Sequence, residues 1–370
     1  MNKRLNAVAA AFLVLVVAAC ARKEAAPAAA GAGGTATETT TGSAPGEPCA
    51  LNVFIWSEYI DPEIVAGFEK EFACKVTIDL YEDNESMMAK LQGGGTSLYD
   101  IVVPGQYLIP VMAKLGLLAE LRHENIPNLA NLDDKFVNPV FDPGNKYSVA
   151  YQWGTVGNYL RKKPGKAIDE TWGLMFDPKL EYGSFLLMDS AREMMGAMAK
   201  YKGISVNSTV LDDMRTLSAA LGEVKQRSQG FEGGVGGKNK VLAKAVDAAV
   251  VYNGDAVRGM SDDPETSYFV PREGGVLWLD SLAVPSKAPH RDVAEKFINY
   301  ILDAKVGAQL SNFNQYATPN KAARQFITPA DLANSAIYPS SEMMAKLDFV
   351  NDLGDANRLY DEVWTQVKSK

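Results

Sequence analysis

The chain has 370 residues, of which 47% are hydrophobic and 22% are charged, and its formal net charge is −8. An acidic balance of this size argues against nucleic acid as a partner and mildly favours cationic partners. The chain contains only three cysteines and two histidines.

The first 48 residues predict export followed by a tether. The basic start MNKR precedes an apolar run of about 15 residues, which is too short and too rich in alanine to predict a membrane span. The run ends in VAAC, which resembles a bacterial lipobox, so we expect residues 1–19 to be a lipoprotein signal peptide and Cys20 to carry lipid. The alternative is an ordinary signal peptide that has a cysteine near its end. Residues 20–48 are rich in Ala, Gly, Thr, Pro and Ser, which predicts a flexible tether.

Two cysteines remain if Cys20 is lipidated. Cys49 stands just before the predicted strand LNVFI, from which it is separated by Ala50, and Cys74 opens the predicted strand CKVTIDLY. If these strands are parallel neighbours in one sheet, the two cysteines lie side by side. An even pair outside the cytoplasm favours a disulfide, and two free buried thiols are the alternative.

Strands and helices alternate after the tether. LNVFIW predicts a strand, and Asp61 and Pro62 then predict an N-cap with proline at the first helical position. KVTIDLY, NESMMAKLQGG and YDIVVPG predict a strand, a helix and a third strand. This order opens a doubly wound parallel sheet, and the roughly 320 residues that follow the tether favour two domains.

Ligands of such sheets lie beyond the carboxyl ends of the strands. Polar and aromatic residues stand at these positions after the first and third predicted strands: Trp56, Ser57, Glu58, Tyr59, Gly105, Gln106 and Tyr107.

The sequence shows no catalytic constellation. It contains no Gly-x-Ser-x-Gly, Walker or His-Glu-x-x-His pattern, and His123 and His290 stand in polar, turn-like settings where we expect solvent exposure. The glycine-rich segment 230–240 follows no clear strand, so we expect a mobile loop there and not a phosphate cradle. We therefore expect no enzyme activity, no cofactor and no metal.

Segments spread along the chain carry a family resemblance. They are NVFIWSEYIDPEIVAGFEKEF, YEDNESMMAKL, YDIVVPGQYLIPVMAKLGLLAEL, FDPGNKYSVAYQWGT, LLMDSARE, EGGVLWLDSLAVP and YATPNKAAR. In this order they resemble the periplasmic spermidine/putrescine-binding proteins of ABC transporters, over roughly residues 50–370. The resemblance implies a two-lobed α/β fold of the type II periplasmic binding proteins, in which each lobe has a mixed, mainly parallel sheet flanked by helices. It places lobe one at 50–154 plus 279–324, lobe two at 155–278 plus 325–370, and a ligand cleft at the hinge.

The segment VLWLDSLAVP puts Trp278 and Asp280 two residues apart in a predicted strand, so both side chains share one face. The resemblance places that face at the cleft. A carboxylate and an aromatic ring together suit an alkyl-ammonium group, through charge-assisted hydrogen bonds and cation–π attraction. The alternative is that Trp278 is ordinary core and Asp280 is a turn or capping residue.

The resemblance also implies ligand contacts from residues on both lobes: Trp56, Glu58, Tyr59, Tyr107, Glu193, Tyr252 and Tyr316. Glu193 equally fits a capping box with Ser190. Ser190 stands where spermidine binders typically have Asp, and Asp255 lies in an aromatic-x-Gly-Asp arrangement that resembles the putrescine-preferring branch. Both differences favour putrescine or cadaverine over spermidine. The alternative role for Asp255 is to cap the helix that follows it.

The sequence therefore predicts a lipid-anchored, monomeric substrate-binding protein of an ABC importer, in the periplasm or at the cell surface. By this reading it delivers a polyamine to permease subunits in the inner membrane. The alternatives are the same fold with another solute (a modified amine, amino acid, sugar or ferric ion), a sensor that uses the same cleft, and an anchored hydrolase. A zwitterion needs a cation such as Arg aimed at its carboxylate, and we see none so placed in the cleft motifs. A ferric ion favours clustered Tyr and His ligands, and His is absent from those motifs.

Overall fold

The computed structural model describes residues 48–180 and 182–369. The predicted signal peptide, the lipidation site Cys20 and the predicted tether up to residue 47 lie outside the described residues. No helix within the described ranges has the length and apolar character needed to cross a membrane.

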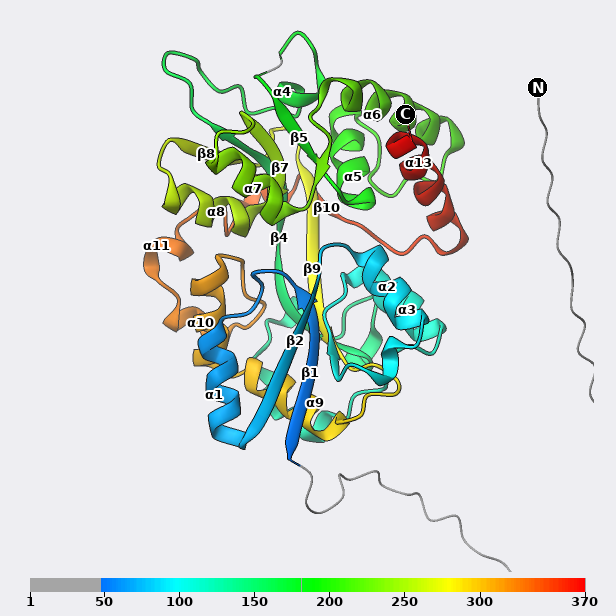
Figure 1. Ribbon diagram of the computed structural model, residues 1–370, viewed down its shortest axis with the longest axis vertical. Coiled ribbons are helices and arrows are strands. Elements are labelled where there is room, and N and C mark those ends of the chain that lie inside the picture. Colours follow the sequence, from blue (N-terminus) through cyan, green and yellow to red (C-terminus); the bar gives the residue numbers. More distant parts are fainter. Residues whose placement is uncertain (1–47, 181, 370) are drawn as a thin grey trace, which may run out of the picture. The chain divides into compact units, whose positions relative to one another are not determined.

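Ten strands in the described part of the chain form one mixed sheet (Figure 1). They are β1 (Cys49–Trp56), β2 (Cys74–Tyr81), β3 (Ile101–Val102), β4 (Ser148–Arg161), β5 (Phe185–Met188), β6 (Phe231–Glu232), β7 (Ala248–Tyr252), β8 (Thr266–Phe269), β9 (Gly275–Ala283) and β10 (Leu347–Phe349). The order is β2-β1-β3-β9-β4-β7-β5-β6, with β8 on β4 and β10 on β9. β1 is parallel to β2 and β3, and β5 is parallel to β6 and β7, which confirms the predicted α/β class.

Two long strands join the two ends of this sheet. Residues 148–155 of β4 pair with β9, whereas residues 156–161 pair with β7 and β8. We call the part around β1–β3 lobe one and the part around β5–β8 lobe two, so β4 and β9 run between the lobes (Figure 1). The residue boundaries that the sequence suggested for the lobes stay a prediction.

Helices flank both ends of the sheet (Figure 1). They are α1 (Pro62–Phe72), α2 (Asn84–Gln92), α3 (Ile109–Lys114), α4 (Gly173–Phe176), α5 (Ala191–Lys202), α6 (Leu211–Arg227), α7 (Gly234–Leu242), α8 (Asn253–Asp262), α9 (Arg291–Ile301), α10 (Ala304–Asn314), α11 (Pro329–Leu332), α12 (Ser341–Met344) and α13 (Asn357–Ser369). In Figure 1, α1, α2, α3, α9 and α10 surround the strands of lobe one, and α4 to α8 with α13 surround those of lobe two.

Helix α1 begins as its sequence predicts. The Asp61 side chain accepts a hydrogen bond from the Glu63 backbone N–H, and Pro62 occupies the first helical position, where no backbone donor is needed. Ile64 and Phe68, one turn apart, are buried against the sheet. A local cap and a local apolar spacing thus account for this helix, which packs against β2.

The glycine-rich segment 230–240 is not a loop, so that prediction was wrong. It contains β6 and most of α7. A Cβ atom on Gly237 would lie 3.2 Å from Val251 and 3.3 Å from Ala249, both on β7. The glycines thus let α7 approach β7 closely, and this packing outweighs the poor helix propensity of glycine.

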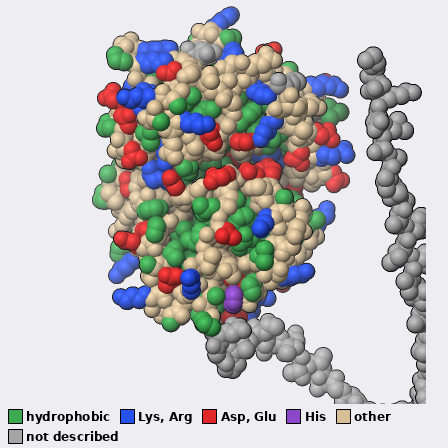
Figure 2. All heavy atoms as spheres, in the orientation of Figure 1, with side chains coloured by type: hydrophobic (Ala, Val, Ile, Leu, Met, Phe, Trp, Pro, Cys, Tyr) green, Lys and Arg blue, Asp and Glu red, His purple; other side chains and the backbone are tan. Residues whose placement is uncertain are grey.

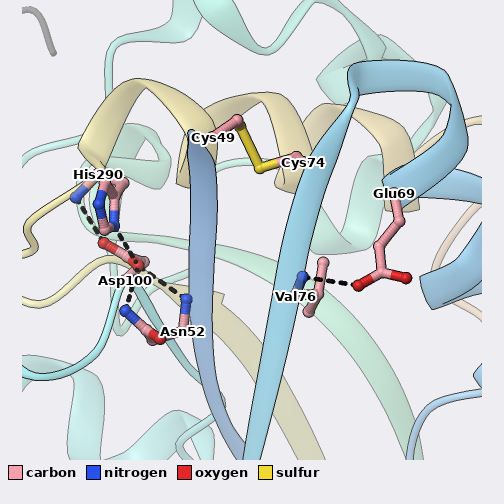
Figure 3. The surroundings of a disulfide bond; sticks show 7 residues. All are labelled: Cys49, Asn52, Glu69, Cys74, Val76, Asp100 and His290. Atoms are coloured by element: carbon pink, nitrogen blue, oxygen red, sulfur yellow. Dashed lines mark hydrogen bonds and ion pairs between the residues drawn. A yellow bond between two sulfur atoms is a disulfide. The ribbon is translucent and has the colours of Figure 1, made fainter. Parts of the chain in front are cut away.

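The expected disulfide between Cys49 and Cys74 is present, which confirms that prediction (Figure 3). The two residues are register partners in the parallel pair of β1 and β2, and their Cα atoms are 4.4 Å apart. The bond therefore fastens the first strand of the described chain to its neighbour at the start of both strands.

Side chains around the disulfide hold the same end of the sheet (Figure 3). The Asp100 carboxylate accepts hydrogen bonds from the backbone N–H groups of Asn52, at 2.8 Å, and His290, at 2.6 Å. The His290 ring also contacts Asp100, with Nδ1 3.1 Å from Oδ2. His290 is therefore half-buried and not solvent-exposed as expected, whereas His123 is exposed.

Removal of this disulfide is expected to lower the stability of the folded body. Replacement of Cys49 and Cys74 by serine frees a segment of 25 residues in the unfolded chain, and loop-closure entropy for such a segment corresponds to about 3 kcal/mol. Denaturant unfolding with and without reductant measures the change. Reductant should destabilise the natural chain and leave the double variant unaffected; an equal response of both proteins would contradict the prediction.

Candidate functional site

A cavity of about 50 Å³ lies between the two lobes. This is several times the roughly 10–15 Å³ that one water molecule requires. Ten of the twelve residues predicted to contact a ligand line it: Trp56, Ser57, Tyr59, Tyr107, Glu193, Tyr252, Asp255, Trp278, Asp280 and Tyr316. Glu58 and Ser190 do not line it.

The hinge strand β9 supplies the floor of the cavity. Trp278 and Asp280 both line it, as the alternation of strand side chains predicts. The Tyr59 hydroxyl donates a hydrogen bond to Asp280 Oδ2 at 2.9 Å. Asp280 is half-buried. Removal from water raises the pKa of Asp280 to about 8, the hydrogen bond from Tyr59 opposes this rise, and the charge of Glu193 adds to it.

Aromatic rings from three segments surround these two residues. The Trp278 ring centroid lies 5.1 Å from that of Tyr316 and 5.7 Å from that of Tyr252, and both pairs meet edge to face. Tyr59 stands 5.4 Å from Tyr316 in the same arrangement. The π faces of such rings are negative, so the group forms an apolar but cation-compatible wall.

A glycine on β4 makes room for Trp278. Gly154 is the register partner of Trp278, and a Cβ atom on it would lie 2.6 Å from the indole ring and 2.1 Å from the side chain of Asn253. No other residue type fits without movement of β4 or β9. The local sequence of β4 thus explains how the large ring is accommodated beside the hinge.

Glu193 lies in the first turn of α5 and is 4% exposed. The Ser190 hydroxyl donates a hydrogen bond to its carboxylate. Ser190 stands at the N-cap but its side chain makes no capping hydrogen bond, so the first half of a capping box is absent. Burial raises the pKa of Glu193, while the Ser190 hydrogen bond lowers it. Ser190 therefore acts on the cavity through Glu193.

Glu58 forms ion pairs with two cationic side chains. Its Oε2 lies 2.9 Å from Lys238 Nζ and 2.9 Å from Arg258 Nη2. Burial raises the pKa of Glu58, but the hydrogen bonds and charges of Lys238 and Arg258 more than offset this and hold it below its usual value. Glu58 follows β1 in lobe one, whereas Lys238 lies on α7 and Arg258 on α8, so these ion pairs join the lobes.

Asp255 lines the cavity but already has a cationic partner. Its Oδ1 accepts a hydrogen bond from Arg258 Nη2 at 2.6 Å. Burial raises the pKa of Asp255, and the charges of Arg258 and Lys238 oppose that rise. The helix α8 begins at Asn253, with Tyr252 at the N-cap position, so Asp255 lies inside the helix and is not its cap.

Six further residues line the cavity and were not among the predicted contacts: Glu82, Asn84, Gly105, Gln106, Gly234 and Val235. The first four follow β2 or β3, at the strand ends where the rule for α/β sheets already pointed. Gly234 and Val235 begin α7, which lies in the segment that the sequence predicts as a loop. The sequence also gave no sign of Arg258 and Lys238. Their role depends on contacts with Glu58, which lies 200 and 180 residues away from them in the sequence.

The acids and aromatic rings of the cavity can hold a cation. Glu193 and Asp280 line the cavity, and neither forms an ion pair within the part of the chain that the structure describes. No group of three or more His, Cys, Asp or Glu side chains placed to hold a metal ion occurs among the described residues. Two acids with raised pKa values and several aromatic rings line the site, and the charge of Arg192 opposes the rise of the Glu193 pKa.

The chain is similar in sequence and in fold to bacterial solute-binding proteins. A sequence model described as bacterial extracellular solute-binding protein matches residues 63–339. The spermidine/putrescine-binding periplasmic protein of Escherichia coli (strain K12) is 32% identical over 325 residues, which cover 86% of this chain and 91% of that protein. The putrescine/cadaverine-binding protein of Pseudomonas aeruginosa is 29% identical over 332 residues, or 86% and 93% of the two chains. A solved structure, a putative spermidine/putrescine ABC transporter from Listeria monocytogenes, is 34% identical, covers 86% of this chain and 98% of its own, and superposes with a TM-score of 0.80.

Proposed function

This chain belongs to the bacterial extracellular solute-binding proteins, and from that premise we propose that it captures a short aliphatic diamine, such as putrescine or cadaverine, for an ABC importer. The relatives named for polyamines support the ligand class. The mechanism is binding without chemistry: the ligand bridges the lobes, the hinge closes, and the closed form docks on the permease.

The observation that carries the proposal is the pair of cavity carboxylates without a cation, Glu193 and Asp280. Removal of an ionised carboxylate from water costs free energy unless a cation or hydrogen-bond donors compensate for the lost water. Burial therefore favours the protonated form and raises the pKa values of both groups. A ligand with two ammonium groups would supply one charge-assisted partner to each acid. Its methylene groups would pack against Trp278 and the tyrosines.

Acidic side chains beside the cavity support capture of a cation. A neighbouring groove of about 460 Å³ is lined by Glu82, Asp83, Asp189 and Glu232, and Glu82 also lines the cavity. Figure 2 shows Asp and Glu side chains in a band across the middle of one face of the molecule. Asp189 and Glu232 are paired with Lys368 and Lys240, whereas Glu82 and Asp83 form no ion pair among the described residues. Unpaired acids at the edge of a cavity raise the local concentration of an oppositely charged solute.

The location and partners belong to the same proposal. The relatives are periplasmic by name, which supports function outside the cytoplasm, and the disulfide suits an oxidising compartment. Cys20 is proposed as a lipid anchor that holds the monomeric protein near permease subunits of the inner membrane, on the strength of the VAAC sequence alone. Mass spectrometry of the protein from membranes would test the anchor directly.

The ligand class is tested by titration calorimetry of residues 48–370 with putrescine, cadaverine, spermidine, spermine and a set of amino acids, at one pH and salt concentration. We expect putrescine or cadaverine to bind at least tenfold more tightly than spermidine. Binding of an amino acid in preference to every amine would contradict the polyamine proposal. Tighter binding of spermidine than of either diamine would keep the polyamine class and reject the diamine preference.

A zwitterionic ligand is the main competitor, since Arg258 lies near the cavity. Its guanidinium contacts Glu58, Asp255 and the Asn314 carbonyl oxygen, the last at 2.6 Å. These contacts engage both terminal nitrogens of the guanidinium with acceptors of the protein. The diamine therefore remains the better match to the charges of the cavity.

A further inference from the structure

Two acids and two cations form a closed cluster at one side of the cavity. Arg258 Nη2 lies 2.9 Å from Glu58 Oε2 and 2.6 Å from Asp255 Oδ1, and Lys238 Nζ lies 2.9 Å from the same oxygen of Glu58. The side chains of Lys238, Arg258 and Asp255 are 6%, 17% and 4% exposed. We call these four residues the Arg258 cluster. Its formal charges cancel.

The other acids of the cavity contrast with this cluster. Glu193 contacts Ser190, and Asp280 contacts Tyr59, so both have neutral hydrogen-bond donors as partners. Thus, of the four acids that the sequence suggested for ligand ammonium groups, Glu58 and Asp255 form ion pairs with protein cations, whereas Glu193 and Asp280 form none among the described residues. A third acid, Glu82, also lines the cavity, but its side chain is exposed. The carboxylates that are withdrawn from solvent and can still accept a ligand ammonium group are therefore two, Glu193 and Asp280.

From this division we propose that Arg258 determines specificity: its guanidinium takes the place of a further ammonium group, so that the site accepts a dication and discriminates against a trication. The inference rests on the proposed function and explains its diamine preference. A third ammonium group would have to enter near the Arg258 guanidinium and lose part of its water shell, and the unpaired acid left for it, Glu82, is exposed to solvent and attracts it only weakly. Asp255 then contributes by holding Arg258, and not by binding the ligand.

The test compares two dissociation constants in each of several variants. The readout is the ratio of the spermidine constant to the putrescine constant, measured by calorimetry on the folded protein. Arg258→Gln removes the charge and keeps a polar side chain beside the Asn314 carbonyl. It frees Asp255, and we expect the ratio to fall at least tenfold, mainly because spermidine binds more tightly. An unchanged ratio would overturn the inference.

A matched control uses an arginine in a surface ion pair. Arg272 contacts Asp169, and the two side chains are 57% and 50% exposed. Arg272→Gln removes the same charge from the protein far from the cluster, so the ratio should stay within twofold of that of the natural chain. A fall of the ratio equal to that in Arg258→Gln would show a general charge effect and would also overturn the inference.

The variant Asp255→Asn gives a second test, which remains available if Arg258→Gln does not fold. It leaves the cluster with one excess positive charge, so we expect the ratio to rise, with putrescine affinity changed less than threefold. A tenfold loss of putrescine affinity would instead show that Asp255 binds the ligand directly. Failure of the natural chain to bind any polyamine would reject the proposed function, whereas a change of the ratio in the wrong direction would reject only the role of Arg258.

Discussion

Asp280→Asn is expected to weaken putrescine binding by about 2 kcal/mol or more, which is roughly thirtyfold. The Asp280 carboxyl group lies in the cavity, and the Tyr59 hydroxyl, at 2.9 Å, is its hydrogen-bond donor from another side chain. An ammonium group bound there would receive a charged acceptor in the natural chain and a neutral, partly donating amide in the variant. Titration calorimetry measures the difference.

The companion variant Asp255→Asn separates a ligand contact from a general loss of negative charge. Both substitutions remove one carboxylate from the cavity wall, but Asp255 has Arg258 as its partner and Asp280 has no cation. We therefore expect the loss in Asp280→Asn to exceed that in Asp255→Asn at least tenfold. Equal losses would mean that the cavity senses only its net charge, and would contradict the assignment of Asp280 as an ammonium anchor.

Putrescine affinity is expected to rise with pH up to about pH 8 and then to level off. The pKa of Asp280 in the ligand-free protein is raised to about 8, chiefly by removal from water, so this group is mostly protonated at pH 7. The bound form needs the carboxylate, whereas alkyl-ammonium groups, with pKa values near that of Lys at about 10, stay charged throughout this range. Below pH 8 the proton competes with the ligand, and affinity should fall by up to about tenfold per pH unit.

Proton release gives an independent measure of the same linkage. At pH 7, binding should release close to one proton from Asp280, and Glu193, whose pKa burial also raises, adds to the release if it is partly protonated. Calorimetry in two buffers of different ionisation enthalpy measures the number of protons. Asp280→Asn should lose most of the release. An observed enthalpy for the natural chain that is the same in both buffers would contradict the expectation.

Local patterns in the sequence determined much of this protein. The cap at Asp61, the strand that puts Trp278 and Asp280 on one face, and the pairing of Cys49 with Cys74 all follow from spacings within one element or between two adjacent strands. Such features depend on backbone geometry that recurs in every protein, so a single sequence suffices to predict them. The family resemblance then supplied the two-lobed arrangement.

Tertiary structure alone decided which acids of the cleft are free. Glu58 and Asp280 stand in equally suggestive sequence settings, but Glu58 meets Lys238 and Arg258 from the other lobe, while Asp280 meets only a tyrosine hydroxyl among side chains. An ion pair requires its two atoms to lie within about 4 Å, and that distance depends on how α7 and α8 pack across the cleft. The helix α7 was itself hidden in the sequence, because close packing against β7 favours glycines that weaken every local helix signal.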